Sequence, residues 1–257
     1  MRAIPFCISV IMLCPYVAIS QRSGTLFTDS FEQDTAFGNW HHREGCCKYS
    51  IKRTAERCLS GKYAARFELR YSDPLVENGK RAELVATSEE QPKIERWYSF
   101  SIYLPTDYER DTMPEILAQW HEIPDFALGE TWRSPPVALL TANDHWRMDV
   151  RWATDSVNTN ATISGMKIFD LGPCEKGRWT SWVFHLLFTF ENNGIIQVWK
   201  NKVLIQQYNG PNYYNDKSGP YFKIGIYKWG WNNNLPSQTS TRIVYADDIR
   251  VETESPF

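Results

Sequence analysis

Hydrophobic and polar positions alternate with a period of two along most of the chain. The clearest runs lie at 97–104, 146–152, 182–190 and 221–227, and they are rich in aromatic and β-branched residues. Such alternation is typical of half-buried β-strands, and apolar residues at helical spacing are scarce. Turn sequences separate the runs, for example Glu-Asn-Asn-Gly at 191–194. The pattern predicts an all-β fold, a single-domain β-jelly-roll sandwich of antiparallel strands.

The run at 221–227 alternates without a break and predicts which side chains face the core. Its apolar face consists of Phe222, Ile224 and Ile226. The opposite face carries polar or small residues, namely Tyr221, Lys223, Gly225 and Tyr227. A glycine in the middle of a strand predicts that a ligand or another backbone segment approaches closely there.

Composition narrows the function classes. The chain has 257 residues and is 14% aromatic, with 11 Trp, 13 Tyr and 13 Phe. These side chains suffice for a sandwich core and also suit a groove that stacks against sugar rings. The 28 Lys and Arg nearly balance the 30 Asp and Glu, which gives a formal net charge of -2. We expect no nucleic-acid partner, because a nucleic-acid-binding domain usually carries a clear basic excess.

The first 20 residues have the pattern of a secretory signal peptide. A Met-Arg start precedes an uncharged segment at 3–19, and small residues stand near its end. An N-terminal membrane anchor is the alternative, but the segment is marginal in length for a span and contains two prolines. We expect cleavage before Gln21, which leaves 21–257 as a secreted, extracellular domain without a membrane attachment. A monomer is the default expectation.

Four cysteines remain in the expected mature chain: Cys46, Cys47, Cys58 and Cys174. An even number in an oxidising compartment predicts disulfides. A bridge between the adjacent Cys46 and Cys47 would be strained, so we expect Cys58 to pair with one of them and Cys174 with the other. A zinc site is the rival interpretation, but the spacing matches no zinc pattern. We expect no metal, and no acidic loop indicates a need for Ca2+.

Two short clusters combine residue types that bind anions or move protons. Arg81 and Glu83 stand two positions apart, so a strand would place them on one face. Glu83 would then hold a guanidinium that binds an anionic ligand, although a solvated surface pair is the alternative. Gln119 and His121 share a face in the same way, and there the alternative is an ordinary pair of polar residues.

Together with the run at 221–227, these clusters form a recognisable set. R-x-E-L at 81–84, Q-x-H at 119–121 and Y-F-K-x-G-x-Y at 221–227 resemble motifs of the secreted polysaccharide lyases of β-jelly-roll fold, and the alginate lyase families carry close versions of all three. The wider sequence, from 31 to 251, is more similar to the heparin-lyase-I and glucuronan-lyase branch. The segments that carry this similarity are 61–68, 115–121, 132–136 and 219–227.

The resemblance implies an enzyme that cleaves an acidic, uronate-containing polysaccharide by β-elimination, without a cofactor. Arg81 and Gln119 would neutralise the uronate carboxylate and so acidify the proton on C5. His121 is a candidate base, because its unperturbed pKa of about 6.5 lies near working pH. Tyr227 is the candidate acid for O4. Where the C5 proton and O4 lie on one side of the ring, Tyr227 would serve as base and acid, aided by a cation such as Lys223.

Further substrate contacts are expected along the groove. The candidates stand in or near the motifs and are mostly aromatic or basic: Glu83, Lys223, Tyr221, Lys228, Trp229, Arg133 and Arg151. Trp231 is a further candidate for stacking against a sugar, and for both Trp229 and Trp231 packing in a loop is the alternative. Val85 and the pair Lys228-Trp229 depart from the alginate pattern. We therefore expect glucuronan-type β-1,4-glucuronate as first substrate and alginate as second.

Two other function classes use a similar sandwich. A glycoside hydrolase would need two carboxylates that face each other across the cleft, and the chain has no E-x-D-x-E-like strand. A non-catalytic, lectin-like carbohydrate-binding jelly roll is the stronger alternative. It would keep an aromatic groove and Arg81, but it would have little reason to combine Gln119, His121 and Tyr227.

Overall fold

The computed structural model describes residues 24–257 apart from positions 34, 36 and 90. The predicted signal peptide therefore lies outside the described residues. Strands dominate the described chain, which contains two short 3-10 helices and no α-helix. The strands form two antiparallel sheets packed as a sandwich, so the prediction of an all-β fold is confirmed.

The first sheet has eight strands and covers one side of the core. Its order is β13 (Val203–Asn209), β12 (Ile195–Lys200), β11 (Arg178–Leu187), β6 (Glu95–Leu104), β15 (Thr241–Glu252), β4 (Ala64–Arg70) and β3 (Ile51–Thr54), and β1 (Thr25–Asp29) also pairs with β15. The long strands β6 and β15 lie at its centre, where each is hydrogen-bonded on both edges.

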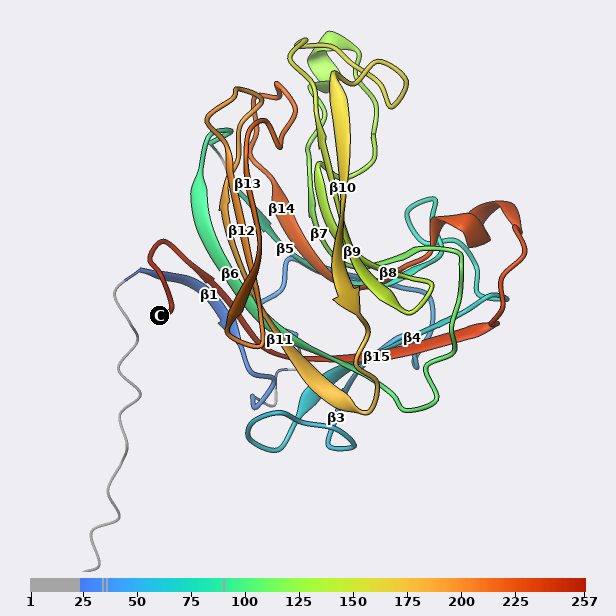
Figure 1. The fold of residues 1–257 in the computed structure, drawn as a ribbon. Coiled ribbons are helices and arrows are strands. Elements are labelled where there is room, and N and C mark those ends of the chain that lie inside the picture. Colours follow the sequence, from blue (N-terminus) through green and yellow to red (C-terminus); the bar gives the residue numbers. More distant parts are fainter. Residues whose placement is uncertain (1–23, 34, 36, 90) are drawn as a thin grey trace, which may run out of the picture.

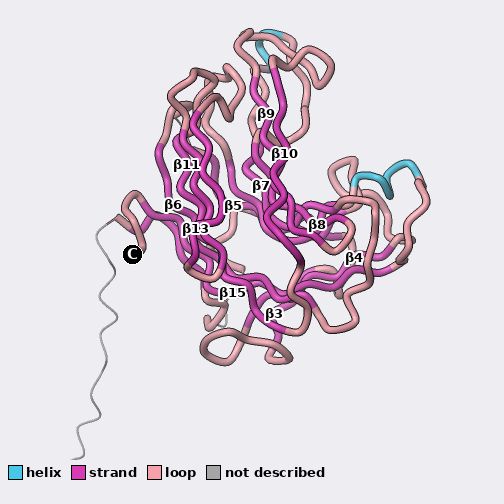
Figure 2. Tube along the Cα trace, viewed as in Figure 1, coloured by secondary structure: helices cyan, strands magenta, loops and turns pink. Residues whose placement is uncertain are grey.

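The second sheet has seven strands, and one of its faces carries the motifs. Its order is β10 (Gly165–Pro173), β9 (His145–Trp152), β8 (Val137–Ala142), β7 (Glu115–His121), β14 (Tyr221–Tyr227), β5 (Arg81–Ser88) and β2 (His42–Gly45). This sheet is curved, with η1 (Phe126–Leu128) at the top of the view and η2 (Trp229–Asn233) at the right (Figures 1 and 2). Its strands β5, β14 and β7 are neighbours although they are distant in sequence.

One hydrophobic core fills the space between the sheets. Phe222, Ile224 and Ile226 point into it, as the alternation at 221–227 predicts. The opposite face of β14 is therefore turned away from the core. Trp231 is fully buried in the same core, which excludes sugar stacking for this residue and favours the alternative that it packs inside the protein.

Gly225 allows strands β14 and β5 to approach each other. Its φ is 144°, and a Cβ on it would lie 2.1 Å from the carbonyl oxygen of Ala82. The approaching group predicted for this mid-strand glycine is thus the backbone of β5. The pairing of β14 with β7 shifts register between Ile224 and Tyr227, close to this glycine.

The cysteines differ from the predicted pairing. Cys46 and Cys47 are bonded to each other, while Cys58 and Cys174 are free thiols. Cys58 lies in the segment after β3, whereas Cys46 and Cys47 follow β2, which belongs to the other sheet. Cys58 is therefore not bonded to either of them, although it is near in sequence. Asp73 has a carboxylate oxygen within 4.8 Å of both bonded sulfurs, but sulfurs joined in a disulfide are not thiolate ligands.

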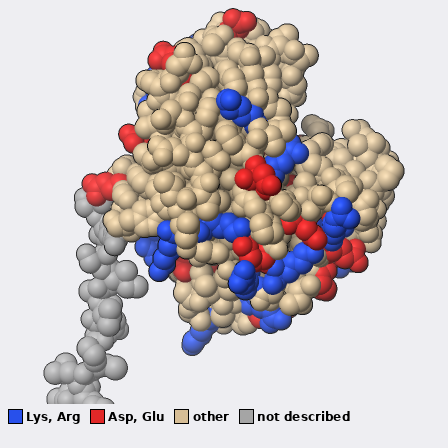
Figure 3. Space-filling model, viewed as in Figure 1, with Lys and Arg blue, Asp and Glu red and all other residues tan. Residues whose placement is uncertain are grey.

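Charged side chains are mixed on the surface. In the view of Figure 3, most Lys and Arg lie in the lower half of the face, among Asp and Glu. This mixture agrees with the near-balanced net charge. In residues 24–257, as far as they are described, no helix has the length and apolar character needed to cross a bilayer.

Candidate active site

Three neighbouring strands bring the three sequence motifs together. Across β14 and its two partners, the directly opposed pairs are Tyr227 with Arg81, Gly225 with Glu83, Lys223 with Gln119, and Tyr221 with His121. Gly225 has no side chain, and the side chains of the other residues lie on the face turned away from the core, because their positions alternate with those of the core residues. The structure thus gathers on one surface residues that are far apart in the chain.

Arg81 and Tyr227 are in direct contact. The guanidinium carbon of Arg81 lies 4.3 Å from the centroid of the Tyr227 ring. Gly79 makes room for both, since a Cβ on it would lie 2.6 Å from Nη2 of Arg81 and 2.8 Å from Cε2 of Tyr227. The side-chain amide of Asn232 donates to the Tyr227 hydroxyl at 3.4 Å. The phenol is therefore held between a cation and an amide.

A buried cluster of charged residues holds Arg81 in place. Nη1 of Arg81 lies 2.9 Å from Oε2 of Glu44 and 3.6 Å from Oε2 of Glu83. Lys223 Nζ contacts the same oxygen of Glu44 and lies 3.2 Å from Glu83. Gln119 donates to Oε1 of Glu83 at 2.5 Å. Two cations and two carboxylates thus neutralise one another inside the sheet face.

The ion pairs in this cluster control its protonation. Burial by itself would raise the pKa of Glu44, but the charges of Lys223 and Arg81 outweigh burial and lower that pKa to about 2. Burial would lower the pKa of Arg81, but Glu83 and Glu44 raise it above its ordinary value. Both groups stay charged across the range in which an enzyme works.

Burial corrects the predicted roles of three motif residues. Gln119, Glu83 and Lys223 are almost fully buried and bonded to protein partners, so they support the site and have no surface for direct substrate contact. The cation that touches Tyr227 is Arg81, in place of the predicted Lys223. The Arg81 side chain itself is 12% exposed.

His121 is oriented by the residue that follows it. Its Nδ1 lies 2.8 Å from Oε2 of Glu122 and 3.1 Å from the carbonyl oxygen of Glu122. Two acceptors at Nδ1 favour the tautomer with the proton on that nitrogen, which leaves Nε2 as a proton acceptor. Its ring stacks on Tyr221 at 5.5 Å, and its side chain is 13% exposed. Burial raises the pKa of Tyr221, which keeps that phenol neutral.

Arg133 lies behind His121 and is buried. Its Nη1 contacts Glu130 at 2.7 Å, its Nη2 contacts Asp216 at 2.6 Å, and its backbone N–H donates to Glu122 at 3.0 Å. Burial raises the pKa of Asp216 to about 7, although the hydrogen bond from Arg133 opposes the shift. The predicted substrate contact by Arg133 is therefore corrected, because this side chain fixes the loop that follows β7.

Lys228 is also buried and requires the same correction. Its Nζ lies 3.0 Å from Asp111 and 3.1 Å from Glu115, below the sheet surface. Arg151, by contrast, stays partly exposed, held at 2.9 Å by Asp149. Trp229 is half-buried beside Tyr227, with ring centroids 6.3 Å apart. These last two remain candidates for substrate contact.

Four residues around the motifs were not found by sequence reasoning. Glu44 and His42 come from the short strand β2, where the side chains of His42 and Glu44 are 3.2 Å apart and His42 is 46% exposed. Their two-residue spacing was the available signal, but no other motif lies near it in sequence. Glu122 directly follows the Q-x-H motif, and Asn232 lies in η2.

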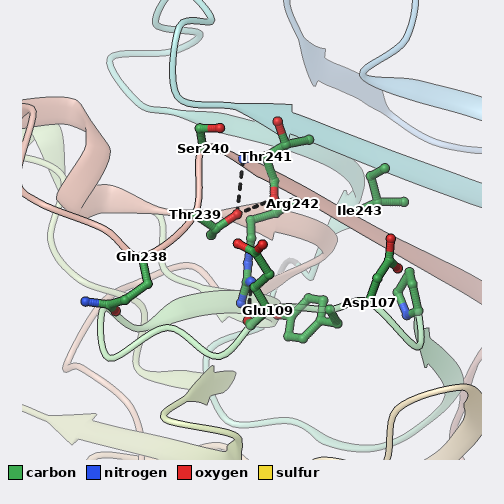
Figure 4. A pocket seen from close by; sticks show the side chains of 10 residues that line it. Asp107, Glu109, Gln238, Thr239, Ser240, Thr241, Arg242 and Ile243 are labelled. Carbon is green, nitrogen blue, oxygen red and sulfur yellow. Dashed lines mark hydrogen bonds between the residues drawn. The ribbon is translucent and has the colours of Figure 1, made fainter.

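A cavity elsewhere in the molecule does not belong to this surface. Its volume is about 460 Å3, and it is lined by the loop after β6 and the segment 238–243 (Figure 4). None of the residues singled out by the motifs lines it. Arg242 extends from this wall to Glu115, with Nε 2.7 and 2.8 Å from the carboxylate oxygens. Arg242, a residue of the cavity wall, therefore takes part in the buried ion pairs and not in the candidate site.

The arrangement suits proton transfer next to an anion. Arg81 places positive charge beside the Tyr227 ring, and His121 lies on the same sheet face with its Nδ1 turned toward Glu122. A cation that binds a carboxylate and a group that accepts a proton are the two elements needed to remove a proton next to that carboxylate.

Comparisons with known proteins agree with this chemistry. A family model described as "Polysaccharide lyase" matches residues 29–250. The search of curated proteins found no match. Among solved structures, an endo-β-1,4-glucuronan lyase from the fungus Trichoderma reesei has 17% identity and a TM-score of 0.75, with 90% of this chain and 96% of that chain covered.

Two alginate lyases are also similar in structure. The marine PL-14 alginate lyase from Aplysia kurodai has 12% identity and a TM-score of 0.61, with 90% of this chain and 100% of that chain covered. An alginate lyase of polysaccharide lyase family 7 has 16% identity and a TM-score of 0.51, with 81% and 85% covered. At these identities the likeness shows a shared fold.

Proposed function

The chain belongs to the polysaccharide lyase family, and on that premise we propose that it cleaves a uronate-containing polysaccharide by β-elimination, with β-1,4-glucuronan as preferred substrate and alginate as second. The observation that carries the proposal is the contact between Arg81 and Tyr227. The structural likeness to a glucuronan lyase over 90% of this chain favours glucuronan.

The chemistry of a uronate explains why these two residues must be neighbours. The carboxylate is bonded to C5, the carbon that loses its proton. A guanidinium that binds the carboxylate therefore lies next to the group that takes the proton. Nη1 of Arg81 is tied to Glu44 and Glu83, and the guanidinium carbon lies over the Tyr227 ring. It stabilises the negative charge that develops on the carboxylate as the proton leaves.

In the proposed reaction Tyr227 acts as base and then as acid. Its phenolate takes the C5 proton, the C–H electron pair forms the C4–C5 double bond, and the C4–O4 bond breaks. O4 then receives the proton from the Tyr227 phenol, which regenerates the phenolate. In β-linked glucuronate the C5 proton and O4 lie on the same side of the ring, so one residue serves both steps. The new chain end is an unsaturated uronate that absorbs ultraviolet light.

His121 complements this pair from the adjacent strand. Because Nδ1 contacts Glu122, Nε2 is the ring nitrogen left to interact with the substrate. We assign it to holding the substrate carboxylate, with removal of the C5 proton as its role if Tyr227 serves only as acid. Gln119, Glu83, Lys223 and Glu44 keep Arg81 in place.

We also propose that the protein is exported and loses its first 20 residues. The uncharged segment at 3–19 behind a basic start supports this. N-terminal sequencing of protein collected outside the producing cell should begin at Gln21. A chain that keeps its first residues would contradict the proposal.

A lyase panel tests the reaction. The mature protein is incubated with glucuronan, polymannuronate, polyguluronate, heparin, hyaluronan and pectate, and absorbance of the unsaturated product is followed. Tyr227→Phe and His121→Ala are run in parallel, with Tyr208→Phe as matched control, because Tyr208 lies on β13 of the other sheet. We expect new absorbance on glucuronan that Tyr227→Phe abolishes and Tyr208→Phe preserves.

The same panel separates an enzyme from a binding module. Absence of absorbance on every polymer, with polymer binding retained, would refute β-elimination and favour a lectin-like role. Rapid cleavage by Tyr227→Phe together with an inactive His121→Ala would transfer proton removal to His121.

A further inference from the structure

Trp132 is an exposed aromatic residue at the edge of the candidate site. It lies in the loop between β7 and β8, outside the three motifs. Its side chain is 55% exposed, although tryptophan is usually well buried. Phe126 in the same loop is 56% exposed, and the two rings are 5.6 Å apart. Two neighbouring exposed aromatic rings form an apolar surface of the kind that binds a ligand or a partner.

The surface is continuous with the site. The ring centroid of Trp132 lies 5.6 Å from that of His121 and 6.5 Å from that of Tyr221. Its contacts with His121, Tyr221 and Phe126 are all edge-to-face, with interplanar angles of 71° to 80°. None of these three contacts is a parallel stack, so no described ring lies flat against Trp132.

The loop that carries Trp132 is tied to the protein by buried ion pairs. The next residue, Arg133, is buried and pairs with Glu122, Glu130 and Asp216. Glu130 additionally accepts from the backbone N–H of Asn158 at 2.9 Å. These charge-assisted bonds fix both ends of the short segment that bears the ring. An exposed tryptophan on a fixed loop loses little conformational entropy when a ligand covers it.

We propose that Trp132 is a stacking platform for one sugar ring of the polysaccharide, on the His121 side of the site, with Phe126 at its outer edge. The C–H groups of a pyranose face are apolar and pack on an aromatic ring, while the hydroxyl and carboxylate groups stay in water. The platform binds a sugar beyond the one that reacts at Arg81 and Tyr227, so it selects for chain length. This inference rests on the proposed function for the identity of its ligand.

Two measurements on Trp132→Ala, Trp132→Phe and the control Phe257→Ala test the platform. Phe257 is another exposed aromatic residue, at 64%, and it contacts Trp97 and Trp199 on the other sheet. The first measurement is the kinetics of cleavage of long glucuronan and of a short glucuronan oligosaccharide. The second is retardation in glucuronan-containing gels, with each substitution made in the Tyr227→Phe background so that no polymer is cut.

Loss of one sugar–ring stack should raise KM on the polymer about tenfold for Trp132→Ala. We expect kcat to stay unchanged and the KM of Trp132→Phe to lie between those of wild type and Trp132→Ala. The ratio of kcat/KM on the polymer to kcat/KM on the oligosaccharide should fall. Retardation in the gel should fall in the same order, and Phe257→Ala should match its parent. Thermal melting is the control for folding. Because Trp132 is exposed, the melting temperature of the variants should equal that of wild type.

Other outcomes overturn the platform. An unchanged KM and unchanged retardation would show that no sugar rests on Trp132. A fall in kcat with unchanged KM would show that Trp132 acts by positioning His121. A wild-type protein that cleaves no polymer but is retarded refutes the lyase proposal alone, and the effect of Trp132→Ala on retardation then decides the platform. A protein that is neither active nor retarded overturns both.

Discussion

Gly79 lets Arg81 and Tyr227 meet, and the guanidinium carbon lies 4.3 Å from the centroid of the phenol ring. The two residues come from opposed positions on β5 and β14, which are far apart in the chain. Under the proposed function, an anionic substrate group binds at the cation, Arg81, whose other side contacts the carboxylates of Glu44 and Glu83. The predictions below follow from this contact and from the charges that support it.

Arg81→Lys should lower kcat/KM by roughly 100-fold, because a lysine cannot offer a planar fork to a carboxylate. Initial rates of ultraviolet absorbance measure the effect. Arg66→Lys is the matched control, since its side chain is 14% exposed and pairs with Glu68 on the other sheet. Equal activity of Arg81→Lys and wild type would contradict a role for Arg81 at the substrate carboxylate.

Glu122→Gln should lower kcat by at least about tenfold and displace the pH–rate profile, because the neutral amide removes the carboxylate charge that lies 2.8 Å from Nδ1 of His121. Glu130→Gln is the control, as Glu130 pairs with Arg133 but has no contact with His121. Both variants should be less stable than wild type. A similar loss of kcat in both would mean that the loop, and not the carboxylate at His121, matters.

Stability should fall in acid because of Glu44. Its folded-state pKa of about 2 is below the ordinary 4.5, so its contribution is fully present above pH 4.5 and is lost as pH falls toward 2. The contribution is on the order of 3 kcal/mol. Denaturant unfolding at a series of pH values should show a flatter acid limb for Glu44→Gln than for wild type. The exposed Glu254→Gln should follow the wild-type curve.

Lys228→Met should destabilise the protein by about 3 kcal/mol, since Asp111 and Glu115 lose a buried cation. KM of the folded fraction should not change, because Lys228 has no surface at the site. Lys52→Met is the control for stability, because Lys52 is an exposed residue of β3. An increase in KM without loss of stability would restore Lys228 as a substrate ligand.

Gly225→Ala should cost about 2–4 kcal/mol, because its Cβ would overlap the carbonyl oxygen of Ala82. Gly129→Ala separates steric overlap from backbone strain. Gly129 also has a positive φ, of 86°, but an added Cβ meets no atom within 4 Å. In thermal or denaturant unfolding, Gly225→Ala should be much less stable than Gly129→Ala. Equal costs would show that the positive φ alone requires glycine.

Alternation in the sequence determined the fold class and the two faces of β14. A period of two can be read locally, since burial of one sheet face demands apolar residues at every second position. Phe222, Ile224 and Ile226 therefore fell on the core side as expected. The order of the three motifs was equally visible, and it pointed to the family.

Only the tertiary structure decided which motif residues reach solvent and what supports them. Gln119, Lys223 and Lys228 have polar side chains typical of a surface, yet each is buried against carboxylates from other segments of the chain. Glu44 comes from β2, where its two-residue spacing from His42 was the available signal and no other motif lies near it in sequence. Pairing of charges across strands depends on register between distant segments, whereas the local sequence carries only each strand's own alternation.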